Sequence, residues 1–235
     1  KERDRVSASL FRTQAEAMAR RYQTIFSRLA RENAVTVVAG SIPLPAPRVE
    51  AGQVIAGRGP IYAISALFRP DGTADPRLVH KVIPIDSESP FVTAGAAADL
   101  PVFDTPAGRL GVLICADSWY PAPYAQMKAG GAELLAVPSF VSEAGSWHKP
   151  WGGYNGAPAP ADIDPGDVGR LTEGQAWRKY ALAGRLAESG ARHGINVFLR
   201  GELWDLGADN GASLAIRTGE IIQAGTGPTL LNLWL

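Results

Sequence analysis

The chain has 235 residues with 23 basic and 23 acidic side chains, so its formal net charge is zero and it has no general attraction for nucleic acid or an anionic membrane. Its single cysteine excludes an intrachain disulfide, and no segment approaches the roughly 18 apolar residues of a membrane span. The charged start, residues 1–5, leads into an amphipathic stretch instead of a signal-peptide core, which favours a cytoplasmic protein.

An apolar stripe at three- and four-residue steps predicts a long first helix. Its members are Phe11, Ala15, Met18, Tyr22, Ile25, Phe26 and Leu29. The Thr-Gln-Ala-Glu segment at residues 13–16 is a possible capping box, unless the helix begins earlier, near Ser7. We expect Asn33 to end this helix.

Three segments in the first half predict strands. Residues 35–42 are β-branched and nearly all apolar, which is typical of a strand covered on both faces, and residues 61–68 predict a second strand. A Pro- and Gly-rich connection at residues 43–59 separates them, and a turn at residues 69–72 closes the second. Residues 78–85 predict a further short strand.

The second half continues the alternation of strands and helices. We expect strands at residues 102–103, 109–114, 133–138, 195–201, 212–217, 221–224 and 230–235. Helices are predicted at residues 123–129 and 175–193, and residues 144–174 read as a long loop rich in Gly, Pro and Trp. Because no repeat or low-complexity tract interrupts this order, we expect one layered α/β domain over residues 1–235.

Cys115 stands where the apolar segment 109–114 meets the polar turn 116–121. A thiol between a strand and a helix is well placed for nucleophilic attack, because free helix N–H groups stabilise a thiolate and a developing oxyanion. The alternative is that Cys115 is a small buried hydrophobe. None of the three histidines forms a recognisable Cys–His arrangement, so a papain-like dyad has weak support.

Lys81 lies inside the otherwise apolar run of residues 78–85. A lysine in such a run either reaches the surface or is held beside a partner charge. Glu88 follows seven positions later in a turn-like segment, where its carboxylate can fold back on the lysine.

Three motifs in sequence order carry a family resemblance: His-Lys-Val-Ile-Pro at residues 80–84, then Glu88, then Gly-Val-Leu-Ile-Cys-Ala-Asp-Ser-Trp-Tyr-Pro at residues 111–121. From about Leu29 onward the chain resembles the nitrilase or carbon–nitrogen hydrolase superfamily, particularly its aliphatic-amidase-like and carbamoylase-like members. Further matching segments lie at residues 37–42, 70–72, 211–213 and 218–222.

The resemblance implies an αββα layered sandwich that hydrolyses a non-peptide carbon–nitrogen bond (amide, carbamoyl or nitrile). Cys115 then resembles the nucleophile that forms an acyl-enzyme. Lys81 and the backbone N–H of Ala116 resemble the groups that stabilise the oxyanion, and Glu88 resembles the glutamate that positions the lysine and the substrate. No cluster of His, Cys and Asp has metal-ligand spacing, so we expect neither metal nor cofactor.

One departure from the family pattern concerns the general base. Relatives carry this glutamate in a Pro-Glu pair upstream of the Gly-Ser segment that Gly40 and Ser41 match, and residues 1–39 hold no such pair. We therefore expect the first strands of the family fold to be missing from this chain. The favoured interpretation is a fragment of an ordinary hydrolase; the alternatives are a non-catalytic, nitrilase-like binding or assembly protein and an acyltransferase that uses the same residues.

Other positions bear on the substrate and on assembly. We expect Trp119, Tyr120 and Phe140 to bind an amide or nitrile substrate, with an apolar or planar acyl group; the alternative is that the tryptophans pack the loop or a subunit interface. Asp117 is predicted to cap the following helix. Since relatives form eight-layer dimers, the resemblance also implies a homodimer or a higher homo-oligomer.

Overall fold

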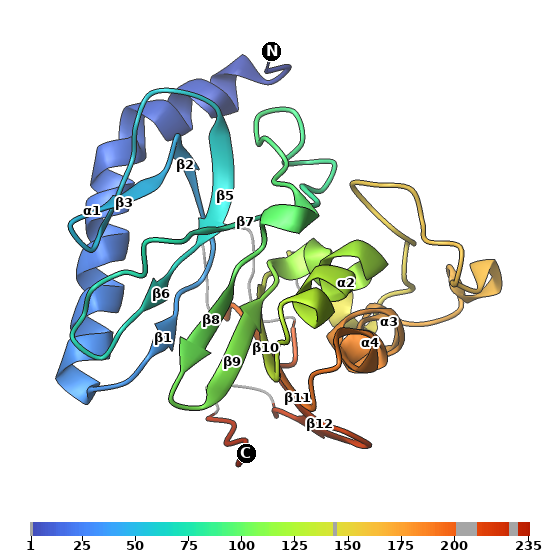
Figure 1. The fold of residues 1–235 in the computed structure, drawn as a ribbon. Coiled ribbons are helices and arrows are strands. Elements are labelled where there is room, and N and C mark those ends of the chain that lie inside the picture. The colour runs from blue at the N-terminus through green and yellow to red at the C-terminus, as the bar shows by residue number, and fades with distance from the viewer. Residues whose placement is uncertain (1, 143–144, 201–210, 226–229) are drawn as a thin grey trace. The chain divides into compact units, whose positions relative to one another are not determined.

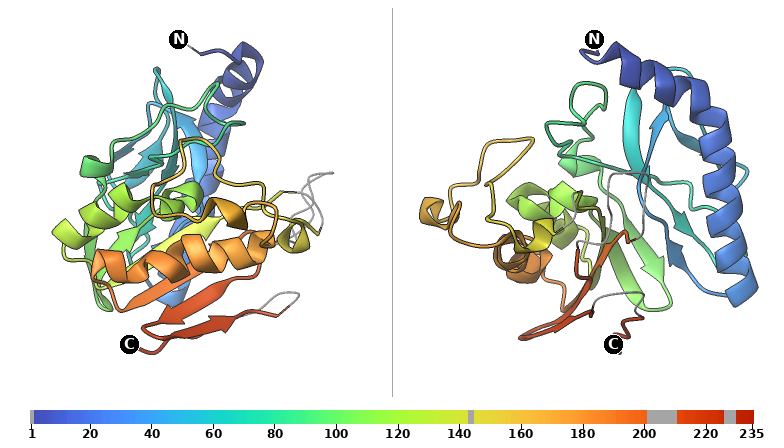
Figure 2. Two further views of the ribbon diagram at one scale, coloured as in Figure 1. Left: turned by 90° about the vertical axis from the view of Figure 1, so that its right-hand side faces the viewer. Right: turned by 180° about the vertical axis from the view of Figure 1, so that it is seen from behind.

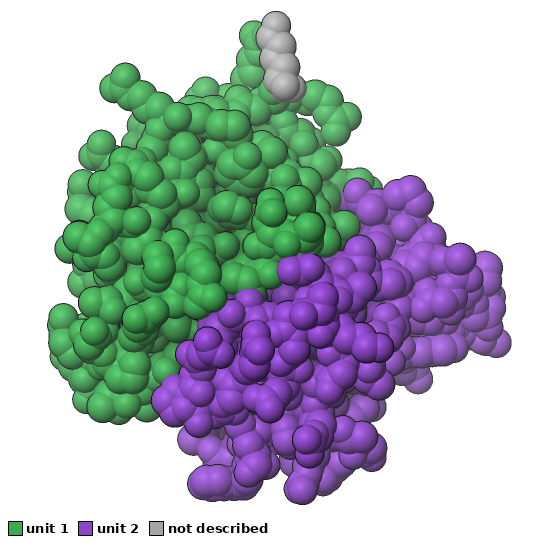
Figure 3. Space-filling model, in the orientation of Figure 1, with its two compact units in different colours: residues 1–101 green, residues 102–235 purple. Residues whose placement is uncertain are grey.

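The computed structural model describes residues 2–142, 145–200, 211–225 and 230–235 (Figure 1). The polypeptide divides into two compact units, residues 1–101 and residues 102–235 (Figure 3). That the whole chain forms a single domain stays a prediction. Within the described ranges, no helix is both long enough and apolar enough to cross a membrane.

The first unit is built on helix α1 (Arg5–Asn33). Its N-cap is Asp4, whose carboxylate accepts hydrogen bonds from the backbone N–H groups of Val6 and Ser7 at 3.1 and 3.0 Å. The earlier of the two predicted starts is therefore confirmed and the capping box at residues 13–16 is wrong, whereas the predicted end at Asn33 is confirmed.

The predicted apolar stripe of α1 is only partly buried. Ala15 and Tyr22 are buried and Met18 and Phe26 pack against the core, whereas Ile25 and Leu29 are exposed. The inward face is instead completed by alanines, at positions 8, 19 and 30. Small side chains let the helix lie close to the strands beside it (Figure 1).

Short antiparallel strands form the rest of the first unit, in three small sheets ordered β1-β6, β2-β5-β7 and β3-β4. Their bounds are β1 (Val37–Val38), β2 (Ile42–Pro45), β3 (Arg48–Glu50), β4 (Gln53–Ile55), β5 (Ile61–Ser65), β6 (Leu67–Phe68) and β7 (Val79–His80), followed by the 3₁₀ turn η1 (Ala97–Asp99).

Several strand predictions in this unit need correction. The segment 35–42 is not one strand buried on both faces: β1 and β2 are separate, and between them lie the buried Ala39 and the exposed Gly40 and Ser41. The segment 43–59 contains most of β2 and the whole β3–β4 hairpin, and the segment 78–85 contributes only β7. The turn at residues 69–72 is confirmed, with the Gly72 N–H donating to the Arg69 carbonyl at 2.8 Å.

Tyr22 joins α1 to the strands and explains why the segment 61–68 is interrupted. Its ring packs against Phe26 and Phe68, at centroid distances of 4.9 and 6.0 Å. Its hydroxyl donates to the Gly40 carbonyl at 2.9 Å and accepts from the buried Ala66 N–H at 3.1 Å. Ala66 separates β5 from β6 because its N–H points to the helix.

The second unit is a six-stranded sheet of order β13-β12-β11-β10-β9-β8, in which only the β9–β10 and β10–β11 pairs are parallel. Its strands are β8 (Val102–Thr105), β9 (Gly108–Val112), β10 (Leu134–Ser139), β11 (His193–Phe198), β12 (Leu214–Arg217) and β13 (Glu220–Gln223). Its helices and turns are η2 (Cys115–Trp119), α2 (Pro121–Ala129), η3 (Ser146–His148), η4 (Pro165–Asp167), α3 (Glu173–Tyr180), α4 (Leu182–Arg185) and η5 (Leu186–Ser189).

The helices α2 and α4 cover the same face of this sheet (Figure 2). Gly111, Leu135 and Gly194 stand side by side on three neighbouring strands. A Cβ on Gly111 would lie 2.2 Å from the sulfur of Met127 in α2, and one on Gly194 would lie 3.1 Å from Leu182 in α4. The two glycines therefore allow both helices to approach the sheet closely.

Two predictions in the second unit are wrong. The helix expected over residues 175–193 breaks at Ala181, where the backbone is extended, and His193 already opens β11. Residues 230–235 have no regular structure, and Leu230 and Trp234 are each 83% exposed. The loop expected at residues 144–174 is described from residue 145 onward and is largely irregular there. Gly201, the last residue of the strand predicted at residues 195–201, lies outside the described residues.

We predict that Tyr22→Phe lowers the free energy of unfolding by about 1–3 kcal/mol, because the buried Ala66 N–H loses its acceptor. Urea denaturation followed by circular dichroism measures the change. Tyr62→Phe is the matched control, since the Tyr62 hydroxyl makes no hydrogen bond with the described residues. Equal stabilities of the two variants would contradict the prediction.

Candidate functional site

Cys115 begins the short turn η2, shortly after strand β9 ends at Val112. Its backbone φ of +50° lies in the left-handed region, which Cys115 shares with only three other non-glycine residues in the described ranges. This conformation costs an ordinary residue about 1–2 kcal/mol. Such strain persists only where surrounding contacts impose it, and it is concentrated at functional sites.

Hydrogen bonds on both sides of Cys115 impose this conformation. The buried Asp117 carboxylate accepts from the Ile114 N–H at 3.1 Å, and the Ser118 hydroxyl donates to the Cys115 carbonyl at 2.7 Å. Tyr124 of α2 donates from its buried hydroxyl to the Ser118 carbonyl at 2.7 Å. The prediction that Asp117 caps the following α-helix is wrong: it caps η2, and α2 begins without a side-chain cap.

The half-buried thiol of Cys115 lies 3.8 Å from the carbonyl oxygen of Phe140. Phe140 follows β10, which runs parallel to β9, so both residues lie at the carboxyl edge of the parallel strands. Ligands bind at this edge in α/β folds. The structure thus brings together Cys115, the buried Ala116 and Phe140, three of the residues proposed from the sequence.

Trp119 and Tyr120 are each only 7% exposed, and other aromatic rings pack against them. Trp119 stacks on Trp151 at 5.7 Å and meets Trp177 edge-on at 4.9 Å, between ring centroids. Trp147, the first tryptophan of the loop, is buried as well. These contacts favour the alternative in which the tryptophans pack the loop, and substrate binding by Trp119 and Tyr120 stays a prediction.

Lys81 and Glu88 belong to the first unit, where they form an ion pair. Lys81 is 3% exposed and its ammonium donates to Glu88 Oε2, which also accepts from the Ile85 N–H at 2.9 Å. The Glu88 side chain is 28% exposed. The expected fold-back of Glu88 onto the lysine is therefore present, and it points the buried ammonium at a carboxylate that a tight turn holds in place.

His80, next to Lys81, has an imidazole that stacks on Tyr62 at 4.9 Å between ring centroids. Its buried Nε2 has no hydrogen-bond partner among the described residues. Burial lowers the pKa of His80 below its ordinary value of 6.5, although the negative charge of Asp99 acts in the opposite direction. His80 is therefore held as the neutral imidazole.

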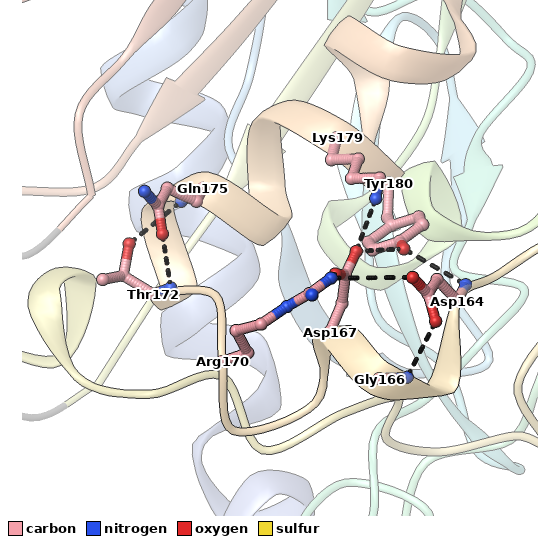
Figure 4. Close-up of polar contacts among 8 residues, drawn as sticks. All are labelled: Asp164, Gly166, Asp167, Arg170, Thr172, Gln175, Lys179 and Tyr180. Carbon is pink, nitrogen blue, oxygen red and sulfur yellow. Dashed lines mark hydrogen bonds and ion pairs between the residues drawn. The ribbon is translucent and has the colours of Figure 1, made fainter.

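The sequence did not reveal a second polar cluster, which surrounds Asp167 in the loop before α3 (Figure 4). Asp167 is completely buried and accepts hydrogen bonds from Lys179, Tyr180 and Arg170. These donors hold the pKa of Asp167 well below its ordinary range, with Lys179 the largest cause. No local sequence signal marks this aspartate, because two of its three partners, Lys179 and Tyr180, come from the next helix.

In the described part of the chain, no group of three or more His, Cys, Asp or Glu side chains is arranged to hold a metal ion. The described residues supply a thiol in a constrained turn, a buried lysine paired with a glutamate, and backbone N–H donors.

The sequence profile of the carbon-nitrogen hydrolase family matches residues 7–157, well over half of the chain. The chain therefore belongs to the carbon–nitrogen hydrolase family, the nitrilase superfamily. The match extends from α1 past the turn that carries Cys115, and it includes Lys81 and Glu88.

Curated relatives match over shorter segments. Nitrilase 2 of Arabidopsis thaliana is 30% identical over 114 residues, which cover 43% of this chain and 34% of the relative. Deaminated glutathione amidase of Synechocystis sp. is 32% identical over 146 residues, which cover 57% of this chain and 50% of the relative. The matched segments thus span a third to a half of these relatives.

Solved structures extend the similarity to nearly the whole chain. The structure of an amidase from Nesterenkonia sp. matches 96% of this chain and 70% of the amidase, with a TM-score of 0.65 and 17% identity. A carbon-nitrogen hydrolase from Helicobacter pylori covers 90% of this chain, and 65% of that protein is covered, with a TM-score of 0.64 and 22% identity. These matches establish a nitrilase-like α/β fold.

We predict that His80 makes the protein less stable in mild acid. The unfolded chain takes up a proton near pH 6.5, whereas the folded protein takes it up only at lower pH, so the stability present above pH 6.5 is lost as the pH falls below it. His80→Phe keeps the stacking on Tyr62 and removes the titration. Its melting temperature should fall less than that of the parent between about pH 7.5 and pH 5.5.

A substitution of the exposed His148, His148→Asn, is the control and should retain the parent's pH dependence. If the melting temperatures of the parent and of His80→Phe fall by the same amount over this pH interval, His80 is not the group that lowers the stability in mild acid.

Proposed function

We propose that this protein hydrolyses a small, non-peptide carbon–nitrogen bond (amide, carbamoyl or nitrile) through an acyl-enzyme on Cys115. The observation that carries the proposal is the left-handed backbone of Cys115 at the carboxyl edge of two parallel strands. Non-glycine residues in this strained conformation cluster at active sites, where the nucleophile of a covalent mechanism lies. Membership of the carbon–nitrogen hydrolase family supports the same chemistry.

In the proposed reaction, the Cys115 thiolate attacks the amide carbon and forms a C–S bond while the carbonyl electron pair moves to oxygen. The Lys81 ammonium and the Ala116 N–H stabilise this oxyanion, and each such donor contributes on the order of 3 kcal/mol. Collapse breaks the C–N bond, and the leaving amine takes up the proton that the Cys115 thiol gave up when the thiolate formed. Water then attacks the thioester, which releases the acid and restores the thiol.

Glu88 is proposed to orient the lysine. A buried ammonium without a partner would be strongly disfavoured, so the Lys81–Glu88 pair both compensates for the burial of the ammonium and fixes its direction. The oxygen of Glu88 that accepts from Lys81 is itself held by the Ile85 N–H. This leaves the pair little freedom to reorganise during the reaction.

The proposed substrate is a small amide with an apolar or planar acyl group. Structures of the Nesterenkonia amidase contain butyramide or carry the acetamide moiety of fluoroacetamide on the active-site cysteine. In this chain, Trp119, Tyr120 and Phe140 are proposed to shape the acyl side of the site. We also propose a homodimer or a higher homo-oligomer, as the family resemblance implies.

A second candidate is a non-catalytic, nitrilase-like binding protein. The observation that favours it is that residues 1–39 of this chain hold no Pro-Glu pair. A protein of this family that had no general base would lose a contribution of typically 10²–10⁴-fold in the rate of proton transfer. A turnover assay with small amides separates the two candidates.

We predict that fluoroacetamide forms a covalent adduct on Cys115 in the folded protein, seen by intact mass and peptide mapping. Because Cys115 is the only cysteine, urea-unfolded protein is a matched control and should react much more slowly. Cys115→Ala should give no adduct and no amide hydrolysis. Full hydrolytic activity in Cys115→Ala would rule out the acyl-enzyme.

We predict that Lys81→Met lowers kcat for an amide by about 10²–10³-fold, through loss of an oxyanion donor. The double variant Lys81→Met with Glu88→Gln removes both charges of the pair, so the fold is retained without a lone buried charge. It should be as inactive as the single variant. Lys128→Met, at an exposed position of α2, is the control that keeps the parent's kcat.

If the double variant is folded and turns over at the parent's rate, Lys81 has no part in stabilising the transition state. Circular dichroism and the melting temperature establish that the variants are folded before the rates are compared.

A further inference from the structure

Residues 149–173 form a closed loop in the second unit, here called the aromatic loop. The Glu173 N–H donates to the Lys149 carbonyl at 2.9 Å, and the Trp151 N–H donates to the Leu171 carbonyl at 2.8 Å. The Gly169 N–H in turn donates to the Trp151 carbonyl at 2.8 Å. Since both ends are held together by backbone hydrogen bonds, the loop behaves as one structural unit.

The aromatic loop touches the turn that carries Cys115. Trp151 stacks on Trp119, and Tyr154 meets both Trp119 and Tyr120 edge-on at 5.6 and 5.3 Å. The Tyr120 hydroxyl donates to the backbone carbonyls of Asn155 and Ala157, at 3.2 and 3.0 Å. A shift of the loop would therefore move the rings that pack against the Cys115 turn.

Tyr180, the last residue of α3, holds the loop from the opposite side. Its ring stacks on Trp151 with centroids 5.3 Å apart. Its hydroxyl donates to the Asp167 carboxylate at 2.6 Å and accepts from the Asp164 N–H at 3.2 Å. Figure 4 shows Tyr180 and Lys179 directed toward Asp167 from the helix.

Charge fixes Asp167 in place. Lys179 donates to the same carboxylate at 2.5 Å, and Arg170 donates to its other oxygen (Figure 4). Charge-assisted hydrogen bonds of this kind restrict geometry more than neutral ones. A buried carboxylate adds little to the free energy of unfolding, because the cost of its desolvation offsets its attraction to the cations. The main effect of Asp167 is therefore to fix the geometry of its partners.

Arg185 adds a second connection between the loop and the helices. Its buried guanidinium donates to both carboxylate oxygens of Asp162, at 2.8 and 3.0 Å, and to the Tyr180 carbonyl at 2.9 Å. Tyr180 is thus held at its backbone by Arg185 and at its hydroxyl by Asp167. Two buried charged groups converge on one tyrosine.

We infer that Asp167 and Tyr180 are positioning residues for Cys115, acting through the stacked rings of Trp151 and Trp119. Asp167 fixes the hydroxyl of Tyr180, Tyr180 fixes Trp151, and Trp151 supports Trp119 at the end of the turn that begins with Cys115. The left-handed conformation of Cys115, which hydrogen bonds within its turn impose, is then also supported from outside the turn. The catalytic part of this inference rests on the proposed function.

The test uses Tyr180→Phe, which keeps the ring stacking and removes only the hydroxyl. Amide hydrogen exchange, read by mass spectrometry in peptides that cover residues 113–120, should accelerate about tenfold, because the turn loses part of its support. The value of kcat for a small amide should fall by about tenfold, since small misplacements of a nucleophile are costly. Asp167→Asn should act in the same direction.

Tyr22→Phe is the matched control, because it also removes a buried tyrosine hydroxyl with two hydrogen bonds, in the first unit. It should lower the melting temperature and leave both exchange at residues 113–120 and kcat unchanged. A merely structural role of Tyr180 would give the same result in Tyr180→Phe, and that result would overturn the inference.

Hydrogen exchange separates this inference from the proposed function. If the parent hydrolyses no amide, the proposed function fails, and exchange at residues 113–120 still decides whether Tyr180 supports the turn. If the parent is active and Tyr180→Phe changes exchange but not kcat, positioning for the reaction is refuted while the proposed function stands.

Discussion

The second unit depends on one backbone constraint, the left-handed conformation at Cys115. The chain leaves β9, reverses at this residue, and enters η2 and then α2, so the connection from the strand to the helix turns at a single position. The reversal is unfavourable for a residue with a side chain, and hydrogen bonds of Asp117 and Ser118 compensate for it. It leaves the thiol at the edge of the sheet and Trp119 packed in the interior.

Two buried ion pairs show how the protein uses charge in opposite ways. In the first unit the cation is buried, since Lys81 is enclosed and Glu88 is partly exposed. In the second unit the anion is buried, since Asp167 is enclosed and its partners Lys179 and Arg170 reach solvent. A buried ammonium suits stabilisation of an oxyanion, whereas a buried carboxylate with several donors suits the fixing of a loop.

Family membership and local structure lead to the same chemistry from different directions. The family profile places the chain in the carbon–nitrogen hydrolase family, and a strained thiol and an oriented lysine are groups that an acyl-enzyme mechanism of the proposed kind uses. The aromatic loop adds a constraint that neither motif contains. It connects the turn that carries Cys115 to a helix more than fifty residues further along the chain.

The sequence alone determined the elements and motifs that depend on near neighbours. The stripe of α1, the turn at residues 69–72 and the return of Glu88 to Lys81 follow from spacings of a few residues. Only the tertiary structure decided the break at Ala181, the strand interruption at Ala66 and the burial of Asp167. Each of these depends on a partner that is distant in sequence or belongs to another element, as Ala66 depends on Tyr22, 44 residues away. Local sequence patterns do not indicate such partners.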